Sequence, residues 1–141
     1  MIKVLVAEDN NLMRGAIIDL LTAAGDIAVV SECTDGDEVL AEAQRTHPDV
    51  ALMDMAMQRM GGLEATRILR VACPETRVVV LTGSLSAGRV REAHALGAAG
   101  YLLKGGEPEE LVSGVRSVAT GGTAWSAPAR TLLDQGSSTP P

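Results

Sequence analysis

Aromatic side chains are almost absent from this chain, which has one tryptophan, one tyrosine and no phenylalanine. Because hydrophobic residues still make up 46% of the sequence, the core must be built from Val, Leu, Ile, Ala and Met. That share excludes an intrinsically disordered chain, and 141 residues allow one domain with a proper core. Tyr101 is the only aromatic residue before the C-terminal tail, which makes it a candidate for a specific role.

Cysteine, positive charge and long apolar runs are also scarce. Cys33 and Cys73 match no metal-binding spacing and no disulfide framework, so we expect two free thiols in a reducing cytoplasm. The net charge of −6 makes direct binding of a phosphate backbone unfavourable. No apolar stretch approaches the roughly 20 residues needed to span a membrane. Residues 1–3 lead straight into a strand pattern, so we expect no signal sequence and no membrane association.

What the sequence does contain is a regular alternation of short apolar runs and amphipathic segments. The apolar runs predict five strands, at residues 3–7, 27–30, 49–53, 77–81 and 99–103. Apolar residues at helical spacing predict five helices, at residues 13–24, 38–46, 61–73, 87–96 and 108–120. A fivefold βα repeat requires parallel strands with right-handed crossovers. We therefore predict an α/β fold, a (βα)5 doubly wound parallel sheet of flavodoxin-like type with strand order 2-1-3-4-5.

The C-terminal part of the chain has a different composition. After Gly121-Gly122, residues 123–141 become rich in Ser, Thr, Pro and Gly towards the end. This composition predicts a domain at 1–122 followed by a linker or tail at 123–141, with one short helical turn near 130–134.

Polar residues stand where four of the five predicted strands end. Glu8 and Asp9 follow the first strand, Asp54 ends the third, Thr82 the fourth and Lys104 the fifth. The carboxyl ends of parallel strands share one edge of the sheet, and strands one and three are neighbours in the expected order. Each residue alone is ordinarily a turn former, a helix cap or a solvated side chain. Their joint occurrence predicts three clustered carboxylates beside a hydroxyl and an ammonium group.

Three carboxylates at one place are unfavourable unless a cation neutralises them. Carboxylate oxygens with room for water suit Mg²⁺, which takes one or two protein carboxylates together with phosphate oxygens. A lysine and a hydroxyl add partners for a phosphoryl group. The set is typical of a site that holds a phosphoryl group and Mg²⁺ next to a nucleophilic aspartate, here Asp54.

At these residues the sequence resembles the receiver domain of two-component response regulators, of the NarL/FixJ (LuxR-like) type. The resemblance covers about residues 2–128. It is carried by Val4-Leu5-Val6-Ala7-Glu8-Asp9 with Arg14, Asp54-Met55-Ala56-Met57, Leu81-Thr82-Gly83, Gly97-Ala98-Ala99-Gly100-Tyr101-Leu102-Leu103-Lys104, and the stretch from Pro108 to Gly122.

The resemblance implies a role for each matching residue. Asp54 would accept a phosphoryl group from a sensor histidine kinase, and Lys104 would pair with that group. Mg²⁺ would be bound by Glu8, Asp9, Asp54 and the backbone carbonyl of Ala56. Thr82 and Tyr101 would act as switch residues that change the face from the fourth strand to the fifth helix. The domain would be a phospho-acceptor and not an enzyme with an external substrate.

The resemblance also implies partners and a location. A cytoplasmic regulator of this type would form a homodimer on activation, either through the first and fifth helices or through the face of helix four, strand five and helix five. It would bind DNA only through a C-terminal domain missing here. We expect the chain to be a receiver excised from a longer transcription regulator, the alternative being a natural stand-alone receiver.

Three positions depart from the usual family pattern. The family often has Pro where this chain has Gln58 and Asp where it has Gly61, and many receivers have Pro where it has Gly105. The loop that follows Asp54 is therefore expected to differ in shape or mobility. The five side chains expected at the site, those of Glu8, Asp9, Asp54, Thr82 and Lys104, are all present, which predicts competence for phosphorylation.

Other functions on a similar sheet are less compatible with these residues. A phosphatase with an aspartate nucleophile generally needs a second acid two residues later, where this chain has Ala56. A nucleotide or flavin binder needs a phosphate-binding loop after the first strand, where Glu8 and Asp9 repel phosphate. A receiver that acts through protein–protein contacts without phosphorylation stays open as the main alternative.

Overall fold

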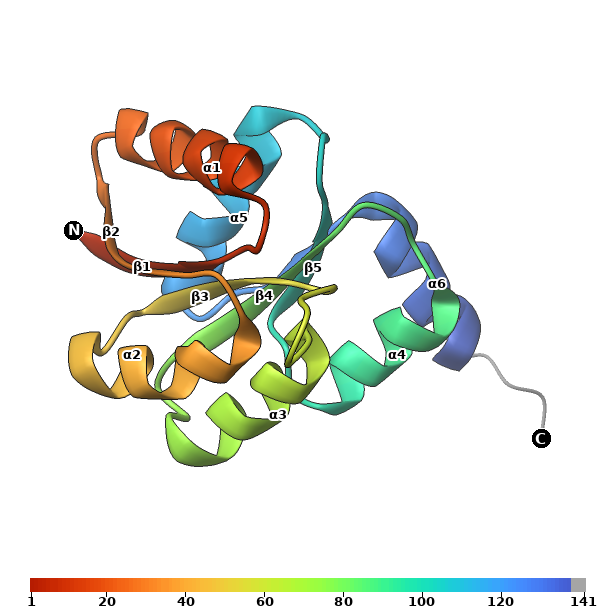
Figure 1. The fold of residues 1–141 in the computed structure, drawn as a ribbon. Coiled ribbons are helices and arrows are strands. Elements are labelled where there is room, and N and C mark those ends of the chain that lie inside the picture. Colours follow the sequence, from red (N-terminus) through yellow and green to blue (C-terminus); the bar gives the residue numbers. More distant parts are fainter. Residues whose placement is uncertain (138–141) are drawn as a thin grey trace.

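The computed structural model of the chain describes residues 1–137, which form one α/β unit (Figure 1). Its strands, in chain order, are β1 (Ile2–Ala7), β2 (Ile27–Cys33), β3 (Val50–Asp54), β4 (Arg77–Thr82), β5 (Gly100–Leu103) and β6 (Ala124–Trp125). Its helices are α1 (Asn11–Ala23), the short 3₁₀ helix η1 (Gly36–Glu38), α2 (Val39–Thr46), α3 (Gly62–Ala72), α4 (Ala87–Ala95), α5 (Pro108–Ala119) and α6 (Ala127–Ser137).

The strands form one parallel sheet with the order β2-β1-β3-β4-β5-β6. The predicted α/β class and the order 2-1-3-4-5 are therefore confirmed, and a sixth strand extends the sheet beyond β5. Register brings the carboxyl ends of the strands together. Ala7 lies opposite Met53, and Thr82 lies opposite Leu103. Residues that follow these positions consequently meet at one edge of the sheet.

Helices cover both faces of the sheet, as Figure 1 shows: α1 and α5 lie on one face, and α2, α3 and α4 on the other. Alternate residues of the central strands enter two separate apolar cores because strand side chains point in turn to opposite faces. In β3, Leu52 belongs to the core under α1 and α5, whereas Met53 belongs to the core under α2, α3 and α4. The four apolar residues of β3 are buried, as their composition predicts, and Asp54 at its end is buried as well.

Strand β2 is longer than its apolar run indicates. It continues through Ser31 and Glu32 to Cys33 because parallel pairing with β1 extends as far as Ala7 and Cys33. Tertiary pairing here overrides a local composition that is typical of a turn. Cys33 and Cys73 are both free and buried. Burial raises the pKa of the Cys33 thiol to about 12, which keeps it protonated.

The segment after α5 packs against the sheet. Strand β6 pairs with β5 through Gly100–Ala124 and Tyr101–Trp125, and α6 lies against α4 (Figure 1). The short turn expected near 130–134 is a helix of eleven residues. Residues 138–141 of the predicted tail lie outside the described residues. The assignment of 123–141 as a linker to a further domain stays a prediction.

A search of residues 1–137 for membrane-spanning segments finds no helix that is both long enough and apolar enough to cross a bilayer.

Candidate functional site

Three carboxylates meet at the carboxyl edge of the sheet. Glu8 and Asp9 follow β1 directly, and Asp54 ends the neighbouring strand β3. One oxygen from each of the three side chains lies within 4.8 Å of the others. Glu8 and Asp54 are buried, whereas Asp9 is exposed. The cluster therefore opens to solvent on the side of Asp9, which is the side from which an ion can enter.

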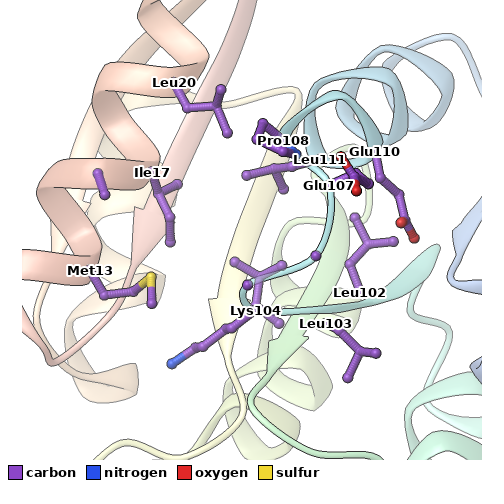
Figure 2. A pocket seen from close by; sticks show the side chains of 14 residues that line it. Met13, Ile17, Leu20, Leu102, Leu103, Lys104, Glu107, Pro108, Glu110 and Leu111 are labelled. Atoms are coloured by element: carbon purple, nitrogen blue, oxygen red, sulfur yellow. The ribbon is translucent and has the colours of Figure 1, made fainter.

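Lys104 supplies the positive charge of this cluster. Its Nζ lies 2.6 Å from Oε1 of Glu8 and 2.8 Å from Oδ1 of Asp54. Burial lowers the pKa of Lys104, but the contacts with Asp54 and Glu8 outweigh burial and raise the pKa above its ordinary value. Figure 2 shows that Lys104 leaves the loop after β5 with its nitrogen turned away from the apolar side chains of Pro108 and Leu111. Lysine thus bridges the two buried carboxylates.

Backbone geometry explains how Lys104 reaches these partners. The N–H of Lys104 donates to the carbonyl of Thr82 at 2.7 Å, which continues the β4–β5 pairing by one residue. Gly105 then has a φ of +77°, a left-handed conformation in which the chain turns into the loop before α5. Proline fixes φ near −65°, so the proline that many receivers have at this position is incompatible with the turn observed here.

Thr82 and Tyr101 lie on the neighbouring strands β4 and β5, opposite Leu103 and Val80, and neither side chain donates a hydrogen bond to the carboxylates. The Thr82 hydroxyl donates to the carbonyl of Ser84 at 2.8 Å. Tyr101 is fully buried, and its hydroxyl has no hydrogen-bond partner among the described residues. Burial raises the pKa of Tyr101. Its ring lies in the same core as Ala129 of α6, with Trp125 packed against that core.

The loop after Asp54 begins close to the acceptor. The N–H of Ala56 donates to Oδ1 of Asp54 at 3.3 Å. The N–H of Met55 donates to the carbonyl of Leu81, and the N–H of Gly62 donates to the carbonyl of Met55. The start of the loop is therefore attached to β4, and its end is attached to its start at Met55.

The donor set fits a small hard cation. One oxygen from each of the three carboxylates lies within 4.8 Å of the others, and carboxylate oxygens are ligands that Mg²⁺ prefers. One of the three residues is exposed, so the open side leaves room for water. No sulfur or imidazole ligand belongs to this cluster, so its chemistry does not favour zinc or copper. The residues present therefore fit the predicted magnesium site.

Comparison with known proteins agrees with this class of fold. A flavodoxin-like sheet with an acidic cluster and a lysine at its carboxyl edge defines the receiver class of signalling domain. The sequence profile of the response regulator receiver domain matches residues 4–116. The chain belongs to the response regulator receiver family, and its relatives identify the NarL/FixJ type. Receivers are signalling domains that generally are not classed as enzymes. The family binds Mg²⁺ at its acidic pocket and interacts with histidine kinases.

Several relatives are identical to this chain at about two fifths of the aligned positions. It is 40% identical over 120 residues to the uncharacterised transcriptional regulatory protein YxjL of Bacillus subtilis, covering 85% of this chain and 55% of the relative. It is 40% identical over 121 residues to the response regulator GacA of Pseudomonas aeruginosa, covering 86% and 56%. The chain therefore spans about half the length of the curated relatives it matches.

Solved structures give the same picture. A two-component response regulator of the LuxR family from Aurantimonas superimposes with a TM-score of 0.91 at 26% identity, covering 97% of this chain and 98% of that one. The receiver domain of the putative response regulator NarL from Mycobacterium tuberculosis superimposes with a TM-score of 0.82 at 33% identity, covering 85% and 97%.

One residue close to the site was not identified from the sequence. Asp35, which follows β2, is buried and accepts hydrogen bonds from the loop after Asp54. Its local signal, an Asp-Gly pair after a strand, predicts only a turn. Nothing in that pair indicates which distant loop the carboxylate contacts, so sequence reasoning missed it.

Proposed function

We propose that this receiver accepts a phosphoryl group on Asp54 from the phosphohistidine of a sensor kinase. The carboxylate oxygen of Asp54 attacks phosphorus, the bond from phosphorus to the imidazole nitrogen breaks, and the imidazole leaves with the electron pair. The observation that carries this proposal is the contact of Lys104 with Asp54 and Glu8 at 2.8 and 2.6 Å. It supports a site already arranged to hold a negatively charged group at Asp54.

The charged residues have distinct tasks in this reaction. Glu8, Asp9, Asp54 and the carbonyl of Ala56 would hold Mg²⁺, which when bound neutralises charge on the phosphoryl oxygens. Lys104 pairs with a phosphoryl oxygen as negative charge develops there. Before the reaction, the same ammonium group neutralises Glu8 and Asp54, which otherwise repel an incoming anion.

The switch is proposed to start at Thr82. On phosphorylation its hydroxyl leaves the carbonyl of Ser84 and donates to the phosphoryl group, and Tyr101 moves with it. Because Tyr101 shares a core with α6 and Trp125, the movement also changes the packing of the C-terminal segment. In a longer regulator this segment would lead to the DNA-binding domain that controls transcription.

A homodimer on activation is proposed to use α1 and α5. The alternative face, which includes α4, is partly covered by α6 of the same chain. A shallow groove between α1 and α5 exposes apolar side chains, among them Leu20 and Val112. Light scattering before and after activation checks this surface. Val112→Glu is expected to keep the domain monomeric, and dimerisation of that variant would refute the assignment.

The phosphorylation itself is tested with intact protein and a small phosphodonor. With Mg²⁺ and acetyl phosphate, the wild type should gain the mass of one phosphoryl group, and Asp54→Asn should gain none. Asp19→Asn, which changes an exposed carboxylate on α1, is the matched control and should behave as the wild type. Absence of any mass gain or beryllofluoride response in the wild type would overturn the proposal and favour a receiver that acts through protein contacts alone.

A further inference from the structure

The loop between β2 and α2 lies against the loop between β3 and α3. The contact is made by Asp35, whose side chain is only 5% exposed. Its Oδ1 accepts the backbone N–H of Arg59 at 2.8 Å, and its Oδ2 accepts the backbone N–H of Met60 at 3.0 Å. Oδ2 also accepts the N–H of Asp37 at 3.2 Å, within its own loop. One carboxylate therefore joins two loops that lie 24 residues apart in the chain.

The neighbouring Gly36 completes this contact. Its N–H donates to the carbonyl of Met60 at 3.1 Å. A Cβ atom on Gly36 would lie 2.3 Å from that same carbonyl oxygen, so a larger residue would push the loops apart. On the solvent side, the guanidinium group of Arg59 donates to Asp37 at 2.7 Å. We call Asp35 and Gly36, with these contacts to Arg59 and Met60, the loop clamp.

The loop clamp supplies order that the β3–α3 loop does not have by itself. Gly61 is the N-cap of α3 and has no side chain to cap the helix. Between Met57 and Met60, the backbone hydrogen bonds made within residues 1–137 all go to Asp35 and Gly36. The two residues before Gly61 are thus held by a residue of another loop.

Asp35 stays charged while it does this. Burial alone raises the pKa of this carboxyl group, but the backbone N–H groups of Arg59, Asp37 and Met60 outweigh burial and lower the pKa to about 2. The carboxylate is therefore an ionised acceptor at neutral pH, and hydrogen bonds to a charged acceptor are about twice as strong as neutral ones.

We propose that Asp35 is a positioning residue for the phosphoryl and metal site, acting through Arg59 and Met60 on the loop that carries Ala56. This loop starts at Asp54, where the N–H of Ala56 donates to Oδ1, and returns at Gly62. Fixing its middle fixes the path of the backbone at Ala56, whose carbonyl oxygen is a proposed Mg²⁺ ligand. The effect of Asp35 on metal binding rests on the proposed function, but the hydrogen bonds of the loop clamp can be measured without metal or phosphate.

Three variants separate this role from a general effect on folding. Asp35→Ala removes both acceptor oxygens, and Asp35→Asn retains one. Asp37→Ala is the matched control, because it removes a carboxylate from the same short segment. In the other loop, the Asp37 carboxylate contacts only the exposed side chain of Arg59. All are measured at a temperature at which circular dichroism shows each variant to be folded.

The first measurement is amide hydrogen exchange in metal-free protein. Asp35→Ala should accelerate exchange of the Arg59 and Met60 amides at least tenfold, with a smaller effect for Asp35→Asn and wild-type exchange for Asp37→Ala. The second is Mg²⁺ affinity by calorimetry, which should fall about tenfold in Asp35→Ala. Its rate of phosphorylation by acetyl phosphate should recover at saturating Mg²⁺, because the defect lies in metal binding and not in Asp54.

The outcomes distinguish the loop clamp from the proposed function. Wild-type exchange and Mg²⁺ affinity in Asp35→Ala would overturn the positioning role, and so would equal losses in Asp35→Ala and Asp37→Ala. A wild type that takes no phosphoryl group overturns the proposed function instead, and the exchange measurement then still tests the loop clamp.

Discussion

Replacing Lys104 with methionine tests the electrostatics of the site most directly. The side chain keeps its approximate length but loses the charge that lies 2.6 Å from Glu8 and 2.8 Å from Asp54. Three carboxylates whose oxygens lie within 4.8 Å of one another are then left without a cation. We expect the metal-free protein to be destabilised and Mg²⁺ to restore much of the loss.

The magnitude follows from these distances. At an effective dielectric constant of about 20, each contact of roughly 2.7 Å is worth about 6 kcal/mol of attraction before the cost of desolvation. Breaking a buried ion pair by removing one partner costs about 3–5 kcal/mol net. The Lys104 side chain is 19% exposed, so we take the lower end of this range. Lys104→Met should therefore lose about 3 kcal/mol in the free energy of unfolding.

The assay is urea unfolding followed by the fluorescence of Trp125, the single tryptophan of the chain, in EDTA and in Mg²⁺. A ligand at a hundred times its dissociation constant stabilises the folded state by about 2.7 kcal/mol. At the same Mg²⁺ concentration, the gain should be larger in Lys104→Met than in the wild type, because metal and ammonium neutralise the same carboxylates and the variant should bind Mg²⁺ more tightly. Lys3→Met, at the opposite end of β1, is the control and should change stability by about 0.5 kcal/mol or less.

A free energy of unfolding for Lys104→Met in EDTA within about 1 kcal/mol of the wild type would refute this role of Lys104, because that loss is well below the cost of a broken buried pair. Equal stabilisation of variant and wild type by Mg²⁺ would also refute this role of Lys104. It would mean that lysine and metal do not neutralise the same carboxylates.

Two further predictions concern buried polar groups. The pKa of Asp35 in the folded state, about 2, lies below its value of about 3.9 in the unfolded chain. Its contribution of about 2.6 kcal/mol to stability is therefore present above pH 4 and lost as the pH falls through 2. The free energy of unfolding should thus fall less steeply with decreasing pH in Asp35→Asn than in the wild type. An unchanged slope would contradict the lowered pKa of Asp35. Tyr101→Phe removes a buried hydroxyl that has no hydrogen-bond partner among the described residues. The variant should be more stable than the wild type by about 1 kcal/mol in thermal unfolding. A loss of stability would instead reveal a hydrogen bond of this hydroxyl.

Local pattern was sufficient for the architecture. Short apolar runs such as residues 50–53 predicted buried strands, and the amphipathic helices between them required parallel crossovers. The strand ends followed from the same pattern, so the amino-acid order alone predicted Glu8, Asp9, Asp54 and Lys104 at one edge of the sheet. Their roles in phosphoryl transfer stay predictions.

Segments whose structure depends on distant partners were not predictable in this way. Residues 124–137 have the composition of a tail, yet β6 forms because the edge of β5 offers unpaired backbone groups, and α6 packs against α4. Tyr101 is fully buried, and Ala129 and Trp125 of this segment belong to or pack against its core. The departures at Gln58 and Gly61 gave no sign that the middle of the loop after Asp54 is hydrogen-bonded to Asp35.

The sequence by itself determined the sheet order, the residues at the strand ends and the family, because these depend on periodicity and on residue types at fixed local positions. Only the tertiary structure decided that Lys104 bridges Glu8 and Asp54, that Asp35 holds the loop after Asp54, and that the C-terminal segment covers Tyr101. Each of these contacts joins residues far apart in the chain, and local propensity carries no information about which distant groups the packed core brings into contact.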